Sequence, residues 1–352
     1  MREDVILITG ANGEIGHGLI NVLYQKNFNI VALDVAPLDK SLRDKVLTWI
    51  VGDILDQMLL GRLVVEYQIR TIYHLASILS TKAEYNPETA HRINVEGTLN
   101  LLRLAVEQSQ WQGKRVKFIY PSSIAAYGVP RLDDKTKAGK IKEYQCTNPT
   151  TMYGCNKLYC EHLGRYYSAY YRQLAMDAGL SPTVDFRSLR FPGLISAETI
   201  PTGGTSDYGP EMLHAAAKGE PYACFVRPDT RIPFMVMPDA IKALLDLEAA
   251  EQNQLNHYVY NVTSFSPTAQ EIFDIVKKRF PDAQITFKVD EKRQKIVDSW
   301  PEDVDDTAAR NDWGWQPEYD QKRAFDDYLI PAISKLYQPE KDEPKFSLRT
   351  QE

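Results

Sequence analysis

The chain has 352 residues, 43% of them hydrophobic and 25% charged, with a formal net charge of −6 at pH 7. This length can bury a full core in one large domain or two unequal ones. Charges of both signs are spread along the chain without a basic cluster, which argues against a nucleic-acid or membrane-surface role. No apolar run approaches about 18 residues, and Met1-Arg2-Glu3-Asp4 leads directly into the first predicted strand, so we expect a cytoplasmic protein.

The apolar run from Val5 to Ile8 leads into glycines at positions 10, 13 and 16, followed by helical periodicity, which predicts a strand, a glycine turn and a helix. In a dinucleotide-binding turn, Gly10 would turn the chain, Gly13 would let backbone approach a pyrophosphate, and Gly16 would let the helix pack on the strand. The helix N-terminus would offer N–H groups and a partial positive charge to the phosphates. Ordinary strand-to-helix turns also use glycines, so this pattern alone leaves both interpretations open.

The second predicted strand, residues 28–33, ends in Asp34. The dinucleotide-binding fingerprint places an acid about 20 residues beyond the glycines. A carboxylate there accepts hydrogen bonds from the adenosine ribose and repels a 2′-phosphate. Asp34 therefore predicts NAD rather than NADP as the cofactor, and the alternative is that Asp34 only caps a loop.

The third predicted strand, residues 46–54, ends in an acid, Asp53, followed by the apolar Ile54. An acid at this place can bond an adenine amino group, and the apolar residue can cover the ring. Alternatively, Asp53 caps the helix predicted over residues 57–67.

The fourth predicted strand, residues 71–76, is followed by small residues, where backbone must pass close to a cofactor that lies across the carboxyl ends of the strands. We expect His74 to be a hydrogen-bonded core residue. Ser80 lies farther along this loop and could face a substrate.

A long helix is predicted over residues 93–106, and it is apolar nearly all round, which indicates burial on more than one side. Part of its surface could form a dimer contact. The fifth strand, residues 116–123, ends in Ser122 and Ser123, and a linker rich in Lys, Asp and Gly follows over residues 130–146.

The sixth strand, residues 184–191, stops at Pro192-Gly193, and the alternation of strands and helices breaks down beyond it. The expected fold is α/β, a doubly wound parallel sheet (Rossmann) with a smaller C-terminal substrate-binding lid domain. The NAD-binding domain would cover residues 1–192, with a flanking helix near 238–250 and a returning last strand near 258–262; the lid would cover 193–237 and 263–335; and 338–352 would be a flexible tail.

Tyr153 and Lys157 are four residues apart on a predicted helix, which puts both side chains on one face. A free tyrosine, with a pKa of about 10, is mostly protonated at neutral pH. The lysine ammonium and the positive charge of a nicotinamide would together depress that pKa and make Tyr153 a usable base for alcohol oxidation. Ser123 would donate to the substrate oxygen; its spacing to Tyr127-Gly128 favours it over Ser122, which remains an alternative.

The order Thr9-Gly10-x-x-Gly13-x-x-Gly16, Ser123, Tyr153-x-x-x-Lys157 resembles the extended short-chain dehydrogenase/reductase superfamily. Later segments are similar to the epimerase-like, zinc-independent L-threonine 3-dehydrogenases, which oxidise the hydroxyl of threonine with NAD to 2-amino-3-oxobutanoate. These segments begin at Arg190, Gly203, Met237, Arg293 and Ala309, so the resemblance spans nearly the whole chain.

By position, the resemblance implies that Tyr153 is the base, Lys157 its electrostatic partner and ribose anchor, and Ser123 the residue that orients the hydroxyl. It implies substrate contacts from Ser80, Ser123, Tyr153, Thr205, Asp207 and Trp300. It implies NAD contacts from Gly10, Asn12, Gly13, Glu14, Ile15, Gly16, Asp34, Asp53, Ile54, Leu75, Ala76, Ser77, Asn94, Tyr153, Lys157 and Phe191. A homodimer through the helices of Asn94 and Tyr153, with a small-molecule substrate, is implied as well.

Several alternatives stay open. A zwitterion needs an acceptor for its ammonium and donors for its carboxylate, which Asp207 and Thr205 can supply, but residues 203–205 could also be a plain surface turn and residues 298–300 a lid hinge. The linker at 130–146, a stretch near 170–183 and Thr202, which interrupts a glycine triplet, depart from the usual dehydrogenase pattern, so another substrate is conceivable.

Two other function classes compete. A sugar-nucleotide 4-epimerase or dehydratase would need a pocket for a uracil and a diphosphate, and no obvious basic cluster follows Gly193 beyond Arg227, Arg231 and Arg293. A cofactor-sensing regulator could keep the glycine turn but would not need Ser123, Tyr153 and Lys157. The four cysteines form no C-x-x-C pair and the six histidines have no metal-ligand spacing, so we expect reduced thiols and no metal site.

Overall fold

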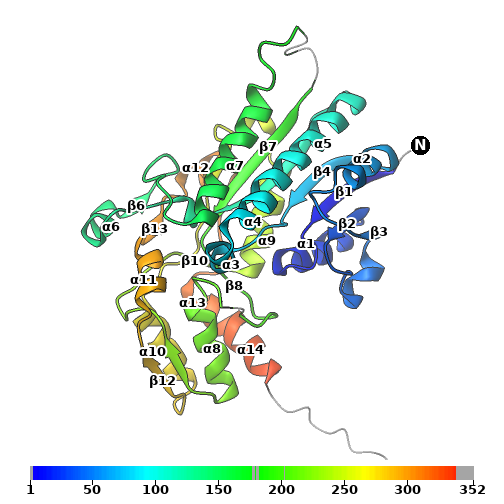
Figure 1. Cartoon of the computed structure of the whole chain (residues 1–352). Helices are drawn as coiled ribbons and strands as arrows, with labels where there is room; N and C mark the ends of the chain where they lie inside the picture. Colours follow the sequence, from blue (N-terminus) through cyan, green and yellow to red (C-terminus); the bar gives the residue numbers. More distant parts are fainter. Residues whose placement is uncertain (1–2, 177–178, 180–181, 202, 338–352) are drawn as a thin grey trace, which may run out of the picture.

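The computed structural model describes residues 3–176, 179, 182–201 and 203–337 (Figure 1). Within them, the central sheet has seven parallel strands in the order β11-β7-β5-β4-β1-β2-β3. Its strands are β1 (Asp4–Thr9), β2 (Ile30–Asp34), β3 (Thr48–Val51), β4 (Gln68–His74), β5 (Val116–Ser123), β7 (Val184–Phe191) and β11 (Val259–Asn261). The order reverses beside β1, which is the topological switch point of a doubly wound sheet, and the predicted fold class is confirmed.

Helices cover both faces of this sheet, which explains why β1 is buried from Val5 to Thr9. Val5 and Leu7 pack with the helices of one face, and Ile6 and Ile8 pack with those of the other. The first face carries α2 (Gln57–Glu66), α5 (Gly97–Gln112) and α7 (Met152–Ala169); the second carries α1 (Glu14–Gln25) and α9 (Met237–Ala249). Because a parallel strand covered on both sides needs apolar residues at successive positions, β1 lacks a polar alternation.

Some element boundaries differ from the predicted ones. The second strand begins at Ile30, because Asn27 adopts a left-handed conformation (φ 60°) that ends the preceding turn. The helix predicted over 93–106 is preceded by α3 (Ser80–Tyr85), α4 (Pro87–His91) and the π-helical turn η2 (Arg92–Glu96), and it runs to Gln112. Short 3₁₀ turns are η1 (Lys40–Lys45), η3 (Ile124–Ala126) and η4 (Gln252–Gln254).

The expected linker at 130–146 contains regular structure, α6 (Leu132–Ala138) and β6 (Lys140–Ile141). Acids in the first turn of α6 and lysines in its last turn complement the helix dipole. The side chain of Lys135 is buried and its Nζ donates to the carbonyl of Val297 (3.2 Å). Since β6 pairs with β13 (Asp303–Val304), distant segments give this stretch its order.

Beyond Gly193, small parallel pairs replace the large sheet: β8 (Gly193–Ile195) with β10 (Phe234–Val236), and β9 (Tyr222–Cys224) with β12 (Ile285–Phe287). The other elements there are α8 (Tyr208–Lys218), α10 (Ala269–Arg279), α11 (Glu291–Asp298), α12 (Thr307–Trp313), α13 (Gln321–Arg323), η5 (Ala324–Leu329) and α14 (Ile330–Leu336). The exception is β11, which joins β7 as the outer strand of the central sheet, as predicted.

A separate hydrophobic core lies among these C-terminal elements and includes the buried side chains of Tyr208, Phe234 and Phe325. Ile124 and Val129, which precede α6, pack into the same core although the sequence assigned them to the first domain. The predicted tail, Thr202 and part of the 170–183 stretch lie outside the described residues. No helix in the described part of the chain is long and apolar enough to cross a membrane.

Candidate active site

A cavity of about 790 Å³ opens at the carboxyl ends of the central strands, between the sheet and the elements that follow Gly193. This volume is within the range of about 300–1,000 Å³ that is usual for ligand sites. Of the site residues expected from the sequence, these line the cavity: Gly10, Asn12, Gly13, Glu14, Ile15, Gly16, Asp34, Asp53, Ile54, Leu75, Ala76, Ser77, Ser80, Ser123, Tyr153, Lys157, Phe191, Thr205, Asp207 and Trp300.

The glycine turn fits a phosphate group. Gly10 has φ +69°, and a Cβ there would lie 2.6 Å from the backbone N of Ala76. A Cβ on Gly16 would lie 2.4 Å from the carbonyl oxygen of Ala11, so α1 packs against the turn at a distance that only glycine allows. Gly13, the N-cap of α1, gives no side-chain cap, so the first N–H groups of the helix stay available to an anion.

Asp34 lies at the tip of β2, where it both orders a loop and faces the cavity. Its Oδ2 accepts a hydrogen bond from the backbone N–H of Asn12 (2.9 Å), and its Oδ1 accepts from that of Ala36 (3.1 Å). The Asn12 side chain donates in turn to the carbonyls of Ala36 and Pro37. Asp34 therefore caps the loop, and the same carboxylate also lines the cavity, within reach of a ligand.

The cap of α2 is Asp56, whose side chain accepts from the N–H groups of Met58 and Leu59 (both 3.0 Å). Asp53 accepts from the N–H of Leu55 (2.9 Å) and lines the cavity, so the interpretation of Asp53 as the helix cap is wrong. Asp56 occupies the residue immediately before the helix, where a side-chain oxygen reaches the first-turn N–H groups.

Asn94 does not reach the cavity, because its side chain is used elsewhere. It is buried, its Oδ1 accepts from the N–H of Ile78 (2.7 Å) and from the hydroxyl of Ser77 (3.1 Å), and its Nδ2 donates to the carbonyl of Ile78 (3.0 Å). Asn94 therefore holds the loop that lines the cavity. His74 is a core residue as expected: it is hydrogen-bonded to Thr9 and Thr98, and burial lowers its pKa to about 3.

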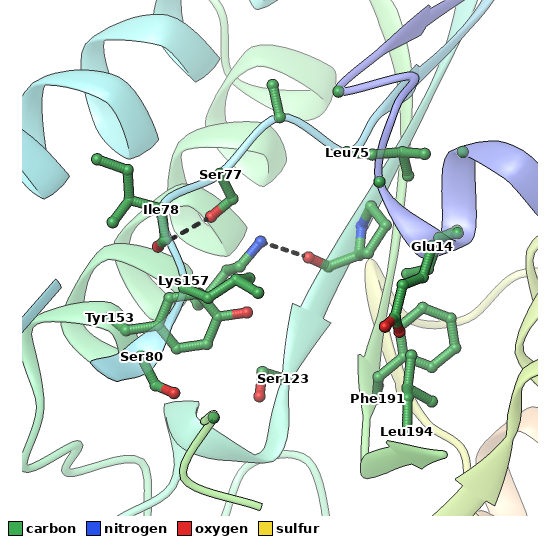
Figure 2. Close-up of a pocket in the computed structure, with 18 of the residues that line it drawn as sticks. Glu14, Leu75, Ser77, Ile78, Ser80, Ser123, Tyr153, Lys157, Phe191 and Leu194 are labelled. Atoms are coloured by element: carbon green, nitrogen blue, oxygen red, sulfur yellow. Dashed lines mark hydrogen bonds between the residues drawn. The ribbon is translucent and has the colours of Figure 1, made fainter. Parts of the chain in front are cut away.

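Ser123, Tyr153 and Lys157 lie together at one end of the cavity (Figure 2). Ser123 is the last residue of β5, and α7 begins at Met152 with Thr151 as its cap. The Nζ of Lys157 donates to the carbonyl of Pro121 (2.7 Å), drawn as the dashed line that starts at the Lys157 nitrogen in Figure 2. Ser122 lines the cavity as well, but its hydroxyl donates to Glu161.

Burial raises the pKa of Tyr153, although a hydrogen bond to Ser123 opposes the rise. Burial outweighs any effect of Lys157 alone on this pKa, and the joint lowering that we expect from Lys157 and a nicotinamide charge stays a prediction. Loss of water around the phenol dominates, and the lysine, whose Nζ lies 5.5 Å from the centre of the Tyr153 ring, is bonded to the Pro121 carbonyl. Burial also lowers the pKa of Lys157 to about 8.

Ser80, Thr205, Asp207 and Trp300 converge on the same end of the cavity. The hydroxyl of Thr205 donates to that of Ser80 (3.1 Å), and Asp207 Oδ2 accepts from the N–H of Gly204 (2.6 Å). Thr205 and Trp300 are buried, so the 203–205 segment is not a plain surface turn.

The segment before Trp300 is fastened at two places. Arg227 makes a bidentate ion pair with Asp298 (2.9 Å for each bond), and the hydroxyls of Thr150 and Ser299 are bonded (2.9 Å). These contacts give no support to a hinge at 298–300.

Sequence reasoning missed Ile78, Leu194 and Thr199, which also line the cavity. Ile78 follows Ser77 on the same loop, so its neighbour was a usable signal. No sequence signal points to Thr199. Its hydroxyl donates to the carboxylate of Glu14, 185 residues earlier, and only the folded loop between β8 and α8 brings the two together.

Four cysteines are free, as expected: Cys146, Cys155, Cys160 and Cys224. No group of His, Cys, Asp or Glu side chains within the described ranges could hold a metal ion. Side chains that line the cavity include a phenol, an ammonium, hydroxyls and carboxylates.

Comparisons with known proteins agree with this geometry. The chain is 36% identical over 317 residues to the mitochondrial L-threonine 3-dehydrogenase of Bos taurus, covering 90% of this chain and 79% of that protein. The structure is similar to a monomeric L-threonine 3-dehydrogenase from a metagenome database (34% identity, 95% of this chain, 100% of that chain, TM-score 0.82). It is also similar to a GalE-like L-threonine dehydrogenase from Cupriavidus necator (34% identity, 95% of this chain, 98% of that chain, TM-score 0.79).

The resemblance noted from the motifs is thus confirmed across both halves of the chain. The model of one family matches residues 6–263, which include the glycine turn, Asp34, the Tyr153–Lys157 helix and the returning strand β11. This protein belongs to the NAD dependent epimerase/dehydratase family.

Proposed function

We propose that this protein is an NAD-dependent dehydrogenase that oxidises the secondary hydroxyl of L-threonine, or of a related 3-hydroxy amino acid, to the 3-keto acid. The observation that carries the proposal is one continuous cavity. The glycine turn and Asp34 stand along it, Ser123, Tyr153 and Lys157 lie at one end, and Ser80, Thr205 and Asp207 are beside them. The similarity to proteins named L-threonine 3-dehydrogenase supports the choice of substrate.

Bound NAD supplies the acceptor for the hydride that leaves the hydroxyl-bearing carbon. The hydroxyl of Ser123 donates to the substrate oxygen and directs it towards Tyr153. As the C–H bond breaks, the O–H proton passes to the phenolic oxygen of Tyr153, which must be ionised beforehand. Because burial raises the pKa of this phenol, nearby positive charge is required to form the phenolate, and the Lys157 ammonium is the cation that the protein supplies.

The amino acid would be held by its two charged groups. Asp207 accepts hydrogen bonds from the ammonium, while the paired hydroxyls of Ser80 and Thr205 donate to the carboxylate. Trp300 forms an apolar wall of the same end. We propose further that the elements following Gly193, without α9 and β11, act as a substrate-binding lid over residues 1–192.

A sugar-nucleotide epimerase is the weaker candidate, because its substrate carries a diphosphate that needs cations. Arg227 is paired with Asp298, Arg231 donates to Ser266 and Glu271, and Arg293 donates to the carbonyl of Gly204 (2.6 Å). Lys157 is the one lysine or arginine among the described residues that line the cavity, and it lies at the catalytic end.

A substrate panel tests the proposal. Purified protein is mixed with NAD and either L-threonine, other 3-hydroxy amino acids or uridine-diphosphate sugars, and the absorbance of NADH is followed. We expect a steady rise with L-threonine. The proposal fails if no 3-hydroxy amino acid gives NADH, and interconversion of the sugars without NADH release would establish the epimerase instead.

Asp207→Asn is expected to raise KM for L-threonine about 10- to 100-fold with a smaller change in kcat, because a hydrogen bond to a charged group contributes about 1.5–3 kcal/mol. The asparagine retains an oxygen for the N–H of Gly204. Steady-state kinetics measure the effect, with the exposed Asp229→Asn as the matched control. An unchanged KM would remove Asp207 from substrate recognition.

Asp34→Asn is expected to reduce the preference for NAD over NADP by roughly one to two orders of magnitude, because the like charge that repels a 2′-phosphate is lost. The ratio of kcat/KM for the two cofactors measures this change. The exposed Asp44→Asn is the control. A ratio that does not move would mean that Asp34 serves only the loop.

Two further expectations stay proposals. A homodimer would form through α5 and α7, where the exposed tyrosines Tyr159 and Tyr166 offer side chains of the kind that interfaces bury. A solution mass of two chains would support it, and a mass of one chain would contradict it. The cytoplasmic location rests on the sequence alone.

A further inference from the structure

Glu14 places a carboxylate where the cofactor's diphosphate is expected to bind. It is the first residue of α1, directly after the N-cap Gly13, and it lines the cavity. Its side chain extends across the cavity towards Phe191 and Leu194 (Figure 2). The hydroxyl of Thr199, in the loop between β8 and α8, donates a hydrogen bond to it.

The groups that face Glu14 do little to stabilise its negative charge. Asp207, at the start of α8, adds a like charge, and Tyr328 of η5 is a neutral phenol that feels the Glu14 charge. Glu14 is an exposed residue, yet partial loss of water around its carboxylate is the main cause that raises its pKa above the usual value of 4.5; the like charge of Asp207 adds to the rise, and the Thr199 bond opposes it.

The diphosphate would add further negative charge at the same place. The N–H groups at the start of α1 favour an anion, whether this is the Glu14 carboxylate or the diphosphate. When both are ionised, they compete for the positive end of one helix and repel each other. A neutral Glu14 removes this conflict and can still share a hydrogen bond with Thr199.

We propose that Glu14 takes up a proton from solvent when NAD binds, and that this carboxyl group makes the affinity for NAD depend on pH. The inference rests on cofactor binding and not on the substrate proposed above. The pKa of Glu14 is then higher in the complex than in the free protein. NAD affinity is constant below the free-state pKa, falls by up to tenfold per pH unit between the two pKa values, and levels off above the higher one.

Calorimetric titration of the full chain with NAD, without substrate, tests this proposal. Measurements from about pH 5 to about pH 9, in two buffers of different ionisation enthalpy, give both Kd and the number of protons taken up. We expect proton uptake and a Kd that weakens with pH in the wild type. Glu14→Gln should abolish that part of the pH dependence and bind NAD about tenfold or more tighter at the alkaline end.

Two other variants make the outcome specific. Thr199→Val removes a bond that stabilises the carboxylate, so the loss of affinity should begin at higher pH than in the wild type. Glu66→Gln, an exposed carboxylate at the end of α2, should behave as the wild type. If Glu14→Gln keeps the wild-type pH dependence, or binds NAD more weakly at every pH, the ionised carboxylate is a cofactor ligand or a bystander, and the proposal is overturned.

Discussion

Tyr153→Phe is expected to lower kcat by about 10²–10⁴-fold, the contribution that a positioned general base makes. The ring and its packing at the start of α7 remain, and only the oxygen that would take the hydroxyl proton is lost. Binding of NAD should change little, because the glycine turn and Asp34 stand at other parts of the cavity. Turnover of L-threonine and direct titration with NAD measure the two quantities separately.

The control for this variant is Tyr159→Phe, an exposed tyrosine on the same helix. It removes the same atom from a side chain that does not line the cavity and should leave kcat unchanged. Wild-type turnover in Tyr153→Phe would mean that another group takes the proton. A sensor that needs no base would also show this result, together with undisturbed NAD binding.

Glu161→Gln is expected to lower the free energy of unfolding by about 3–5 kcal/mol, because breaking a buried ion pair leaves its partner charged and unpaired. Glu161 and Arg190 are both 3% exposed, and Arg190 makes a bidentate contact with the carboxylate (2.6 and 2.9 Å). Ser122 donates to the same carboxylate, so three elements, β5, α7 and β7, are joined at one point. Urea-induced unfolding measures the loss.

Asp134→Asn is the matched control, because Asp134 pairs with Arg131 (3.4 Å) on the surface. Exposed pairs contribute about 0–1 kcal/mol, so this variant should unfold nearly as the wild type does. Equal stabilities of the two variants would show that the buried pair adds nothing. A restored stability in Glu161→Gln combined with Arg190→Met would confirm that the unpaired guanidinium causes the loss.

The residues that the sequence assigns to the cofactor line the cavity, except Asn94, because their signals are local. A buried strand, three glycines and an acid at the end of the next strand are each fixed by neighbours within a few residues. The structure places Gly10, Gly16 and Asp34 along the cavity with contacts that explain why those residue types are needed.

The other half depends on contacts between distant segments, which no local pattern reveals. Residues 130–146 resemble a charged linker, yet β6 gains its partner from β13 and Lys135 is buried against α11. Thr199 reaches Glu14 only after the chain has folded back. Likewise, spacing showed that Tyr153 and Lys157 share a face of the helix. The rise in the pKa of the Tyr153 phenol, however, is caused by burial, which the sequence does not give.

β11 is synthesised long after β7, the strand with which it pairs, and this order affects how the chain can fold during synthesis. β11, which pairs with the edge of β7, is synthesised more than sixty residues after β7. The guanidinium of Arg187 donates to two carbonyls that are also synthesised later, those of Leu247 (2.6 Å) and Ala250 (2.7 Å). A nascent chain that has just released β7 from the ribosome therefore carries an open sheet edge, and Arg187, although paired with Asp185 in the same strand, still lacks its carbonyl partners. Expression of residues 1–192 alone would stop the chain in this aggregation-prone state, so the two halves have to be produced as one polypeptide.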